Sequence, residues 1–536
     1  MRRGIIIPAA GLATRMRPLT NAASKAMLSV NGKPILEYIL SDLLRRNSTS
    51  EIVIVTGKLD DIETYVLNNY HDEVMSGRIK LTTQPTMNGP LGAIEIGASV
   101  LEDDVEEVVI WLGDTLCDDY DDTRSDYLMT SSVEDQENWC LIDHDNNFYD
   151  KPKYDEDIPT KLALIGIYSF GRSKDFFKSL NEAMSDYNIE KEYQIKALLV
   201  NYILMFENHF DLIETNNWYD CGNLENYYSS KARLLSKSSR SFNTMTVDPF
   251  YGTVTKSSNV LKGQEKIERE KEWFNSVEDE GRLFIPQIIP NDNYGELTMS
   301  WESGVPLNEL FIYENVSISN KIHIMKRVLD IYMNVFYKHQ RNTGMIHANQ
   351  KMFYRKNVDR LNEYNVINYK KIIEMQHFIA CAWDELKDEE YISTIHGDLH
   401  TGNILFDPFN GKIKLIDPRG HYGDYDTNLG DIRYDFGKLM HDFYVGYNYM
   451  LAGQYEIEDD KVIIKWDEKE QNILMDTVLD KIETKFKINR VLLQKLGIIF
   501  VATCLPFHND NPKLQEAFWL RAVNLMEKMN ESVYTV

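Results

Sequence analysis

Residues 394–417 are the part of the sequence that most constrains the fold. The alternative, a polar hairpin closed by Asx turns, would not require the order of residue types found there. The segment 394–405 reads TIHGDLHTGNIL and places Asp398 and Asn403 five residues apart on a predicted loop. Asp417 follows a short predicted strand. Phosphoryl transfer from ATP needs a carboxylate that orients the incoming hydroxyl and accepts its proton, and oxygen ligands that hold Mg²⁺ on the phosphates. We therefore predict Asp398 as the base, and Asn403 and Asp417 as magnesium ligands.

The wording of this loop, HGDLHTGN, resembles the catalytic loop of the aminoglycoside phosphotransferase and choline kinase family. The resemblance implies an α+β, two-lobed, protein-kinase-like domain over residues 249–536, with a small lobe to about residue 302 and a large lobe from about residue 303. Asp435, in the sequence DFG, resembles the residue that buttresses this loop in the family. We assign magnesium to Asp417 rather than Asp435, because Asp417 follows a strand and stands close to Asn403 in sequence.

The same resemblance implies a strand-borne lysine that contacts the ATP phosphates and pairs with a helix glutamate. We predict Lys256 for this role, with Lys262 as the competitor, and Glu270 as the partner. A solvated Lys and Glu remain the alternative. Glu302 belongs to a segment, residues 297–307, that resembles the hinge between the lobes, where backbone groups would hold adenine.

The N-terminal half opens with a predicted buried strand, residues 4–8, and a loop of small residues. Small residues let backbone amides approach a triphosphate, and Arg15 adds positive charge where the loop bends. An ordered run follows, with PLT at 18–20, then Lys25, then GKPILEY at 32–38. A Gly/Ala turn with two solvated bases is the alternative. The loop residues predicted to bind nucleotide are Ala10, Gly11, Leu12, Ala13 and Thr14.

This run resembles the sugar-phosphate nucleotidylyltransferases and their relatives that make CDP-choline. The resemblance implies that Arg15 contacts the phosphates being displaced and that Lys25 bridges the nucleotide and the attacking phosphate. Ala13 stands where the family usually has Gly. Strands alternate with helices along residues 1–235, which predicts a mostly parallel, Rossmann-like α/β sheet with ligands at the carboxyl ends of its strands.

Two carboxylates of this half are predicted magnesium ligands, because attacking and departing phosphates repel without a cation between them. Asp114 ends a predicted buried strand, and Asp220 lies in WYDCGNLE, which is similar to the family motif W-x-D-x-G-T. Helix capping is the alternative for both. By resemblance, the nucleotide base is read by Gln84 and Gly89, and the acceptor is contacted by Tyr168 and Glu192, although Glu192 also fits an ordinary first helical turn.

Composition sets the domain boundaries and the class of partner. A chain of 536 residues exceeds one ordinary core, so several domains are expected. We predict a nucleotidylyltransferase domain over residues 1–235, a linker over residues 236–248, and the kinase domain beyond it. The acidic residues 118–157 are expected to form a hairpin excursion or a mobile flap.

The net charge of −25 argues against a nucleic-acid or anionic membrane surface, because a phosphate backbone selects clustered Lys and Arg. One basic and aromatic segment stands out, residues 354–361 (YRKNVDRL). It fits either a site for an anionic group or a helix end packed against acidic neighbours. Five scattered cysteines without CxxC, and no transmembrane stretch, favour a cytoplasmic protein with small-molecule partners, while a homo-oligomer remains open.

Two catalytic units in one chain suggest consecutive steps. A kinase with ATP and Mg²⁺ would phosphorylate a small hydroxyl compound, and an NTP (CTP, UTP, GTP or dTTP) would then donate a nucleotidyl group to that phosphate. A sugar or polyol acceptor is slightly favoured over choline or an amino alcohol, because the turn after Gln84 resembles hexose-1-phosphate enzymes. Surface glycan synthesis is implied by resemblance only. A regulatory or scaffolding protein with one inactive domain is the alternative, against which the intact Asp398 and Asp114 weigh.

Overall fold

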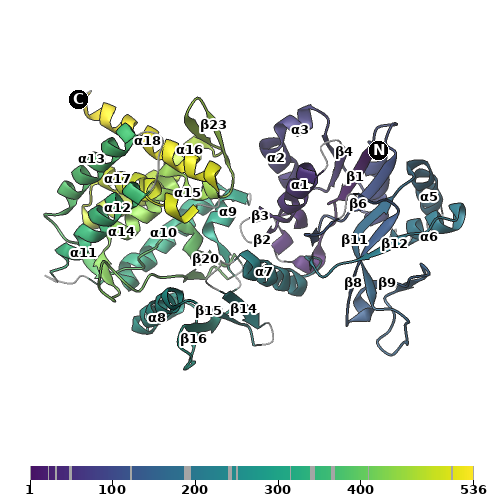
Figure 1. The fold of residues 1–536 in the computed structure, drawn as a ribbon, viewed down its shortest axis with the longest axis horizontal. Helices are drawn as coiled ribbons and strands as arrows, with labels where there is room; N and C mark the ends of the chain where they lie inside the picture. Colours follow the sequence, from purple (N-terminus) through teal and green to yellow (C-terminus); the bar gives the residue numbers. More distant parts are fainter. Residues whose placement is uncertain are drawn as a thin grey trace. The chain divides into compact units, whose positions relative to one another are not determined.

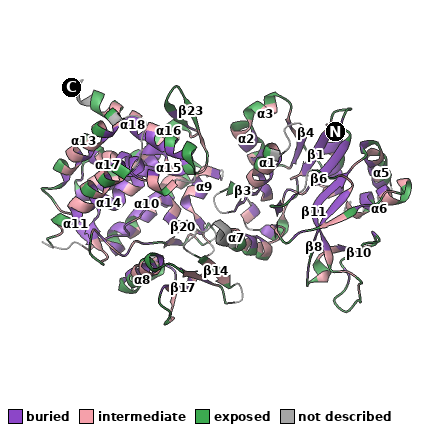
Figure 2. Cartoon of the chain, viewed as in Figure 1, coloured by how far each residue is buried: buried purple, intermediate pink, exposed green. Residues whose placement is uncertain are grey.

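The chain divides into two compact units, Met1–Leu235 and most of Ser236–Val536 (Figure 1). Each unit has a buried interior of its own (Figure 2). The structure is a computed structural model, and it describes all of the chain except residues 1, 18, 22, 31–32, 47–50, 121–122, 186–194, 239–243, 249–250, 303, 314–315, 339–343, 364–368, 409, 509–510 and 535–536.

The first unit is built on a nine-stranded sheet. Its main path, in spatial order, is β10 (Phe148–Asp150), β9 (Cys140–Ile142), β11 (Leu162–Phe170), β6 (Glu107–Trp111), β1 (Arg3–Pro8), β4 (Glu51–Thr56) and β5 (Ile79–Thr83), and off this path β8 (Tyr127–Ser132) pairs with β11 and β12 (Asp211–Glu214) with β8. Strands β6, β1, β4 and β5 are parallel, with Ile5 level with Ile52 and Val109. Strands β1, β4 and β6 are mostly apolar and almost wholly buried because both faces of the sheet are covered, whereas β5, at the edge, is largely only partly buried. The predicted mostly parallel α/β fold is confirmed.

Helices cover both faces of this sheet (Figure 1). Helix α4 approaches β1 closely at Gly97, where a Cβ would lie 2.5 Å from Ile6 Cγ2. Two short strand pairs, β2–β3 and β7–β13, lie outside the large sheet. The bounds are α1 (Ile35–Arg46), α2 (Asp61–Asn69), α3 (His71–Met75), α4 (Pro90–Ala98), α5 (Ser173–Ser185), α6 (Ile195–Phe206), α7 (Leu224–Ser238), β2 (Ser29–Val30), β3 (Lys33–Pro34), β7 (Thr115–Cys117) and β13 (Trp218–Asp220).

The second unit has a small lobe with an antiparallel sheet of four strands, in the order β14 (Thr244–Asp248), β15 (Thr253–Ser257), β17 (Glu296–Ser300) and β16 (Ile288–Ile289). Helix α8 (Leu261–Ser276) packs against β15 and β17. Two sequence predictions need correction. Residues 244–248, predicted as linker, form an edge strand because Met245 and Val247 pack against the core. Residues 118–157, predicted as a hairpin excursion or flap, contribute β8, β9 and β10 to the main sheet of the first unit.

The large lobe is mainly helical, and the two-lobed α+β prediction is confirmed. No described helix is both long and apolar enough to cross a lipid bilayer. The bounds are α9 (Leu307–Tyr313), α10 (Ile318–Ile331), α11 (Ile346–Gln350), α12 (Lys356–Glu363), α13 (Tyr369–Leu386), α14 (Arg433–Met440), α15 (Tyr447–Leu451), α16 (Glu468–Phe486), α17 (Arg490–Ala502), α18 (Pro512–Tyr534), β18 (Val305–Pro306), β19 (Ile392–Thr394), β20 (Ile404–Phe406), β21 (Ile413–Leu415), β22 (Leu429–Asp431), β23 (Tyr455–Glu458) and β24 (Lys461–Ile464).

Candidate active sites

The loop after β1 carries the predicted nucleotide-binding residues of the first unit. Ala13 has a left-handed backbone, with φ of 45°, and Thr20 Oγ1 donates a hydrogen bond to the Ala13 carbonyl at 2.8 Å. The Arg15 side chain is exposed, and it forms no ion pair within the described part of the chain. Of the other predicted loop residues, Ala10 is buried, and Gly11, Leu12 and Thr14 are exposed.

Lys25, Asp114 and Asp220 come together at one edge of the sheet, as their predicted roles require. Lys25 Nζ lies 2.6 Å from Asp114 Oδ2. Strand β13 pairs with β7, which sets Asp220 opposite Thr115, and the Cys221 amide donates to the Asp114 carbonyl at 3.0 Å. Burial and the nearby charge of Asp114 raise the pKa of Asp220 to about 6. A pair of mutually repelling carboxylates suits a divalent cation.

The turn that is predicted to read the base is held together by Gln84. This buried side chain donates through Nε2 to Asn88 Oδ1 at 2.6 Å and to the Gly89 carbonyl at 3.2 Å. Gly89 has φ of 95° and precedes α4, so the turn needs a residue without a Cβ. These contacts give Gln84 a role in shaping the turn, and base recognition by Gln84 stays a prediction.

The two predicted acceptor contacts have different outcomes. Tyr168 lies on β11 with 5% of its surface exposed, packed in the apolar core. Burial, and to a smaller extent the charges of Cys140 and Asp114, raise the pKa of its phenol. Because Tyr168 is buried, little of its surface is open to an acceptor, and the structure gives no support to the predicted contact. Glu192 lies outside the described residues.

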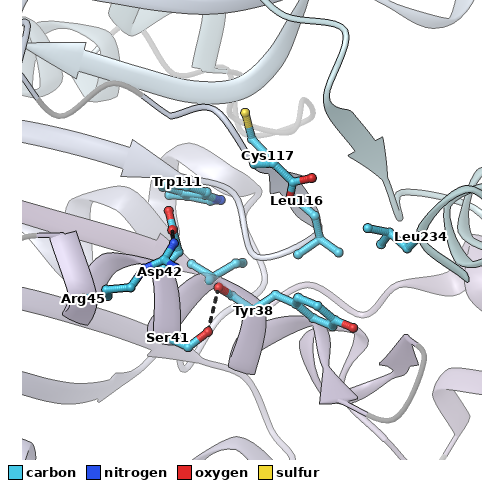
Figure 3. A pocket seen from close by; sticks show the side chains of 10 residues that line it. Tyr38, Ser41, Asp42, Arg45, Trp111, Leu116, Cys117 and Leu234 are labelled. Atoms are coloured by element: carbon cyan, nitrogen blue, oxygen red, sulfur yellow. Dashed lines mark hydrogen bonds and ion pairs between the residues drawn. The ribbon is translucent and has the colours of Figure 1, made fainter. Parts of the chain in front are cut away.

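A separate cavity of about 420 Å³ lies beside α1 (Figure 3). Tyr38, Trp111 and Cys117 line it, and burial raises the pKa of the Cys117 thiol to about 12. Neither Lys25 nor Asp220 lines this cavity, so it is separate from the predicted phosphate site.

In the second unit, Asp435 supports the catalytic loop as predicted. The amides of His396 and Gly397 donate to its carboxylate at 2.7 and 2.9 Å, and Tyr332 Oη donates at 2.6 Å. Asp435 is fully buried and uses both carboxylate oxygens in these bonds. Its geometry is that of a loop support, which leaves the metal-binding role to other residues.

Asp398 is held by Lys438, whose Nζ lies 2.9 Å from Asp398 Oδ1. Burial opposes ionisation, but the charges of Lys438, His400 and Arg419 together hold the pKa of Asp398 well below its usual range. Asn403 Nδ2 donates to the Asp398 carbonyl at 2.9 Å, which fixes the five-residue loop. Asp398 is therefore ionised at neutral pH and able to orient a hydroxyl group.

Lys256 joins the predicted glutamate to the predicted magnesium ligand. Its Nζ lies 2.6 Å from Glu270 Oε2 on α8, and it also contacts Asp417. The two carboxylates raise the pKa of Lys256 against the effect of burial, so the amine stays protonated. Asp417 follows β21 with a left-handed backbone, φ of 58°, and its side chain is half exposed. Glu302, after β17, accepts a hydrogen bond from Ser300 Oγ at 2.7 Å.

Each of the two predicted magnesium sites has two protein ligands. No group of three or more His, Cys, Asp or Glu side chains suited to a metal occurs among the described residues. Asp114 with Asp220, and Asn403 with Asp417, each supply oxygen donors and leave the remaining coordination to phosphate and water, as magnesium sites in phosphoryl transfer require. The residues present therefore fit Mg²⁺.

Sequence reasoning missed one group beside Asp398. Lys438 stands three residues after Asp435 in the DFG stretch, and no motif marks it. Tyr434, one turn earlier on α14, accepts hydrogen bonds from Lys356 Nζ at 3.2 Å and Arg419 Nη1 at 2.9 Å. The basic segment 354–361 thus lies beside Arg419 and the Tyr434 phenol, and Glu363 acts on its Arg360.

Comparisons with known proteins agree with this division. Residues 4–237 match the family model for nucleotidyl transferases, and residues 334–464 match that for fructosamine kinases. UTP–glucose-1-phosphate uridylyltransferase 2 of Streptococcus pyogenes serotype M3 is 31% identical over 212 residues, covering 31% of this chain and 69% of that protein.

Two solved structures are also similar. A UDP-glucose pyrophosphorylase complexed with UDP-glucose has a TM-score of 0.36 and 22% identity, covering 44% of this chain and 100% of that one. A CTP:phosphocholine cytidylyltransferase from Streptococcus pneumoniae has a TM-score of 0.36 and 19% identity, with the same coverage. Residues 334–464 are similar to fructosamine kinases, so a kinase-like domain follows the first unit, and through residues 4–237 the chain belongs to the nucleotidyl transferase family.

Proposed function

We propose that the two units carry out consecutive steps, in which the C-terminal unit phosphorylates a small hydroxyl compound and the N-terminal unit nucleotidylates the product. One observation supports the proposal: in each unit, a lysine that is predicted to contact phosphates is paired with a carboxylate predicted to hold magnesium. Lys25 lies on Asp114 in the first, and Lys256 joins Glu270 to Asp417 in the second. A regulatory protein with one inactive domain would not need both sets.

In the kinase step, the acceptor oxygen bonds to the γ-phosphorus of ATP, ADP leaves, and the hydroxyl proton passes to Asp398. Lys438 keeps Asp398 ionised before the transfer, so its first task is to orient the hydroxyl. Lys256 binds the ATP phosphates, and Glu270 orients it. Asn403 and Asp417 would hold Mg²⁺, which neutralises charge on the phosphates.

In the nucleotidyl transfer step, an oxygen of the new phosphate bonds to the α-phosphorus of an NTP, and pyrophosphate leaves. Lys25 neutralises the attacking phosphate, and Arg15 contacts the departing ones. Asp114 and Asp220 would hold Mg²⁺, which would reduce the repulsion between the attacking and departing phosphates. The main chain of the loop after β1 holds the triphosphate, because its exposed small residues leave backbone amides accessible.

We propose UTP as the first nucleotide to test, because the relative from Streptococcus pyogenes is named for UTP and glucose 1-phosphate. CTP, GTP and dTTP follow. The product would be an activated donor of the NDP-sugar or NDP-polyol type for surface glycan synthesis. Among the residues that the structure describes, no contact favours choline over a sugar or polyol.

A two-stage assay tests the proposal. Purified protein is given ATP, Mg²⁺ and a panel of sugars, polyols, hydroxy acids, choline and amino alcohols, and ADP release is measured. CTP, UTP, GTP or dTTP is then added, and pyrophosphate is measured. We expect one acceptor class to release ADP and one nucleotide then to release pyrophosphate.

Two outcomes would overturn the proposal. Release of ADP without any later pyrophosphate, when every nucleotide has been supplied, would separate the two units into unrelated enzymes. No turnover in either stage, with Asp398→Ala and Asp114→Ala binding nucleotide as the wild type does, would favour a regulatory protein.

A further inference from the structure

A group of basic side chains surrounds Tyr434 in the large lobe, next to the predicted catalytic base. Lys356 and Arg360 come from α12, and Arg419 comes from the segment after Asp417. We call Lys356, Arg360, Arg419 and Tyr434 the Tyr434 cluster. Tyr434 is 2% exposed, and the three basic side chains are each partly buried.

The contacts of Tyr434 hold this cluster together. Its phenol oxygen accepts from both Lys356 Nζ, at 3.2 Å, and Arg419 Nη1, at 2.9 Å. The same two cations lie over its ring, each 5.4 Å from the ring centroid. Arg360 packs instead on Phe507, 4.6 Å from that ring centroid. Two basic side chains therefore share one phenol oxygen in a partly buried place.

Helix α14 connects the cluster to the base. Tyr434 and Lys438 are four residues apart, so their side chains lie on one face of the helix, about 5–6 Å apart at Cβ. Lys438 contacts Asp398, and Tyr434 contacts the cations. Arg419, a member of the Tyr434 cluster, also lies close enough to Asp398 for its charge to act on that carboxylate, so the cluster and the predicted base are neighbours.

The positive charge of the cluster is not neutralised by ion pairs. Within the described part of the chain, none of Lys356, Arg360 and Arg419 forms an ion pair with a carboxylate. The carboxylates that act on the cluster are Asp398, already paired with Lys438, Asp435, which accepts hydrogen bonds from the loop, and Glu363 near Arg360.

The pKa values of two side chains are shifted by the positive charges around Tyr434. Burial, and then the charge of Arg419, lower the pKa of Lys356 to about 7. Burial opposes ionisation of Tyr434, but Arg419, Lys356 and Lys438 lower the pKa of its phenol to about 7. Partly buried cations without a counter-ion are unfavourable, so the site is suited to an anion that arrives with a ligand.

We propose that the acceptor of the kinase step carries an anionic group, a carboxylate or a phosphate, which Lys356, Arg360 and Arg419 bind while the hydroxyl lies on Asp398. This assignment rests on the proposed kinase function and narrows its substrate class. It makes choline a poor acceptor, because a quaternary ammonium would face three cations. The favoured acceptor then changes from a neutral sugar or polyol to an acidic or phosphorylated sugar or polyol.

The ATP phosphates are the other anions that could use this charge. Lys256, from the small lobe, and Asn403 and Asp417 serve those phosphates in the proposed mechanism. The cluster is connected to Asp398 through α14 and Lys438, the side on which the acceptor hydroxyl must lie. If the cluster binds the acceptor, substitutions in it change the KM for the acceptor. If it binds the ATP phosphates, they change the KM for ATP.

The test uses matched acceptors that differ only in their end group. Full-length protein is assayed with ATP and Mg²⁺ against glycerol, glycerate and glycerol 3-phosphate, and against glucose, gluconate and glucose 6-phosphate. Binding of the same compounds is measured by titration calorimetry. We expect one anionic member to bind and react at least about tenfold better than its neutral counterpart, and the carboxylate and phosphate arms identify the anion.

Variants then locate the effect. Lys356→Met should raise the acceptor KM about tenfold to hundredfold and leave the ATP KM unchanged, and Lys356→Arg should restore most of the loss. Arg360→Met provides a second variant on the same helix. Lys370→Met, on α13 with its side chain 84% exposed, removes the same charge outside the cluster and should behave as the wild type.

Three results would overturn the assignment. A neutral or cationic acceptor that reacts best, while Asp398→Ala abolishes turnover, would leave the kinase function standing and remove the anion site. A rise in the ATP KM of Lys356→Met would assign the cluster to ATP. Equal binding of the anionic compounds by wild type, Lys356→Met and Arg360→Met would show that the cluster holds no anion, whether or not turnover is seen.

Discussion

Lys256 Nζ lies 2.6 Å from Glu270 Oε2 and also contacts the carboxylate of Asp417, so one ammonium group joins β15, α8 and the segment after β21. Burial raises the pKa of Glu270 to about 7, and only its pairing with Lys256 opposes that effect. Without ATP the lysine therefore rests on two carboxylates. When ATP binds, the phosphates can replace Asp417 as one of its partners, which would leave Asp417 to hold magnesium.

Glu270→Gln should weaken the kinase step. The neutral amide keeps a hydrogen bond but loses the charge that pairs with Lys256 beside Asp417. We expect kcat/KM for ATP to fall about tenfold to hundredfold, while nucleotidyl transfer to a supplied sugar phosphate is unchanged. Glu272→Gln, an exposed position on the same helix, is the control. Equal losses in both variants would mean that charge on α8 matters in general, and not the Lys256 pair.

The two activities should be separable by single substitutions. Asp398→Asn removes the base and should lower the kinase rate by about 10²–10⁴-fold, with nucleotidyl transfer intact. Asp114→Asn should have the reverse effect, because it removes a magnesium ligand and the partner of Lys25. Each rate is measured with its own supplied substrate. Loss of both activities in either variant, with the fold retained by circular dichroism, would contradict two independent sites.

Lys438→Met should change the pH dependence of the kinase step. Lys438 lowers the pKa of Asp398, and burial raises it, so removing the lysine raises this pKa. The ionised carboxylate is the active form. The acid limb of the kcat/KM profile should therefore move to higher pH, whereas Lys438→Arg should keep the wild-type limb.

The same substitution has a consequence for stability. A carboxylate whose pKa is depressed in the folded state stabilises the protein above its unfolded pKa, and this contribution is lost as pH falls through the folded pKa. The free energy of unfolding of Lys438→Met should thus fall below that of the wild type at neutral pH, and the difference should shrink on acidification. A constant difference across pH would show that Lys438 acts by packing alone.

Much of the site was predictable because the chemistry imposes short-range patterns. The five-residue spacing of Asp398 and Asn403, and an Asp after each relevant strand, are visible without a structure. The sequence also predicts that Asp114 and Asp220 act together, and the structure adds the physical cause, the pairing of β7 with β13. The roles of these residues remain predictions that the experiments above address.

The Tyr434 cluster could not be predicted in this way. Its cations come from α12 and from the segment after Asp417, and they meet only because both pack against α14. The edge strand β14 was missed for another reason: its residues alternate between exposed and partly buried, a weak signal beside the polar stretch that precedes it. Sequence patterns report local order, whereas these features depend on contacts across the lobe.

Trp273→Phe should destabilise the kinase unit. Trp273 is buried on α8, and its indole Nε1 donates to the Ile395 carbonyl at 2.7 Å, immediately before the catalytic loop. Phenylalanine keeps most of the apolar contact but leaves that carbonyl without its donor. We expect a loss of about 1–3 kcal/mol in the free energy of unfolding, measured by urea denaturation. Phe274→Leu, a neighbouring core substitution that removes no hydrogen bond, is the comparison. Its KM for ATP should be closer to the wild-type value than that of Trp273→Phe.

Ala13→Gly should stabilise the N-terminal unit. Ala13 has φ of 45°, a left-handed conformation that costs an L-residue with a Cβ about 1–2 kcal/mol and costs glycine almost nothing. The glycine also gains freedom in the unfolded chain, which offsets part of the benefit. The net expectation is a gain of up to about 1 kcal/mol in the free energy of unfolding. Ala98→Gly, at the last residue of α4 in a helical conformation, should lose about 0.5–1 kcal/mol. If both variants lose stability equally, the backbone at Ala13 is not strained, and the alanine there is simply a well-tolerated replacement for the glycine of related loops.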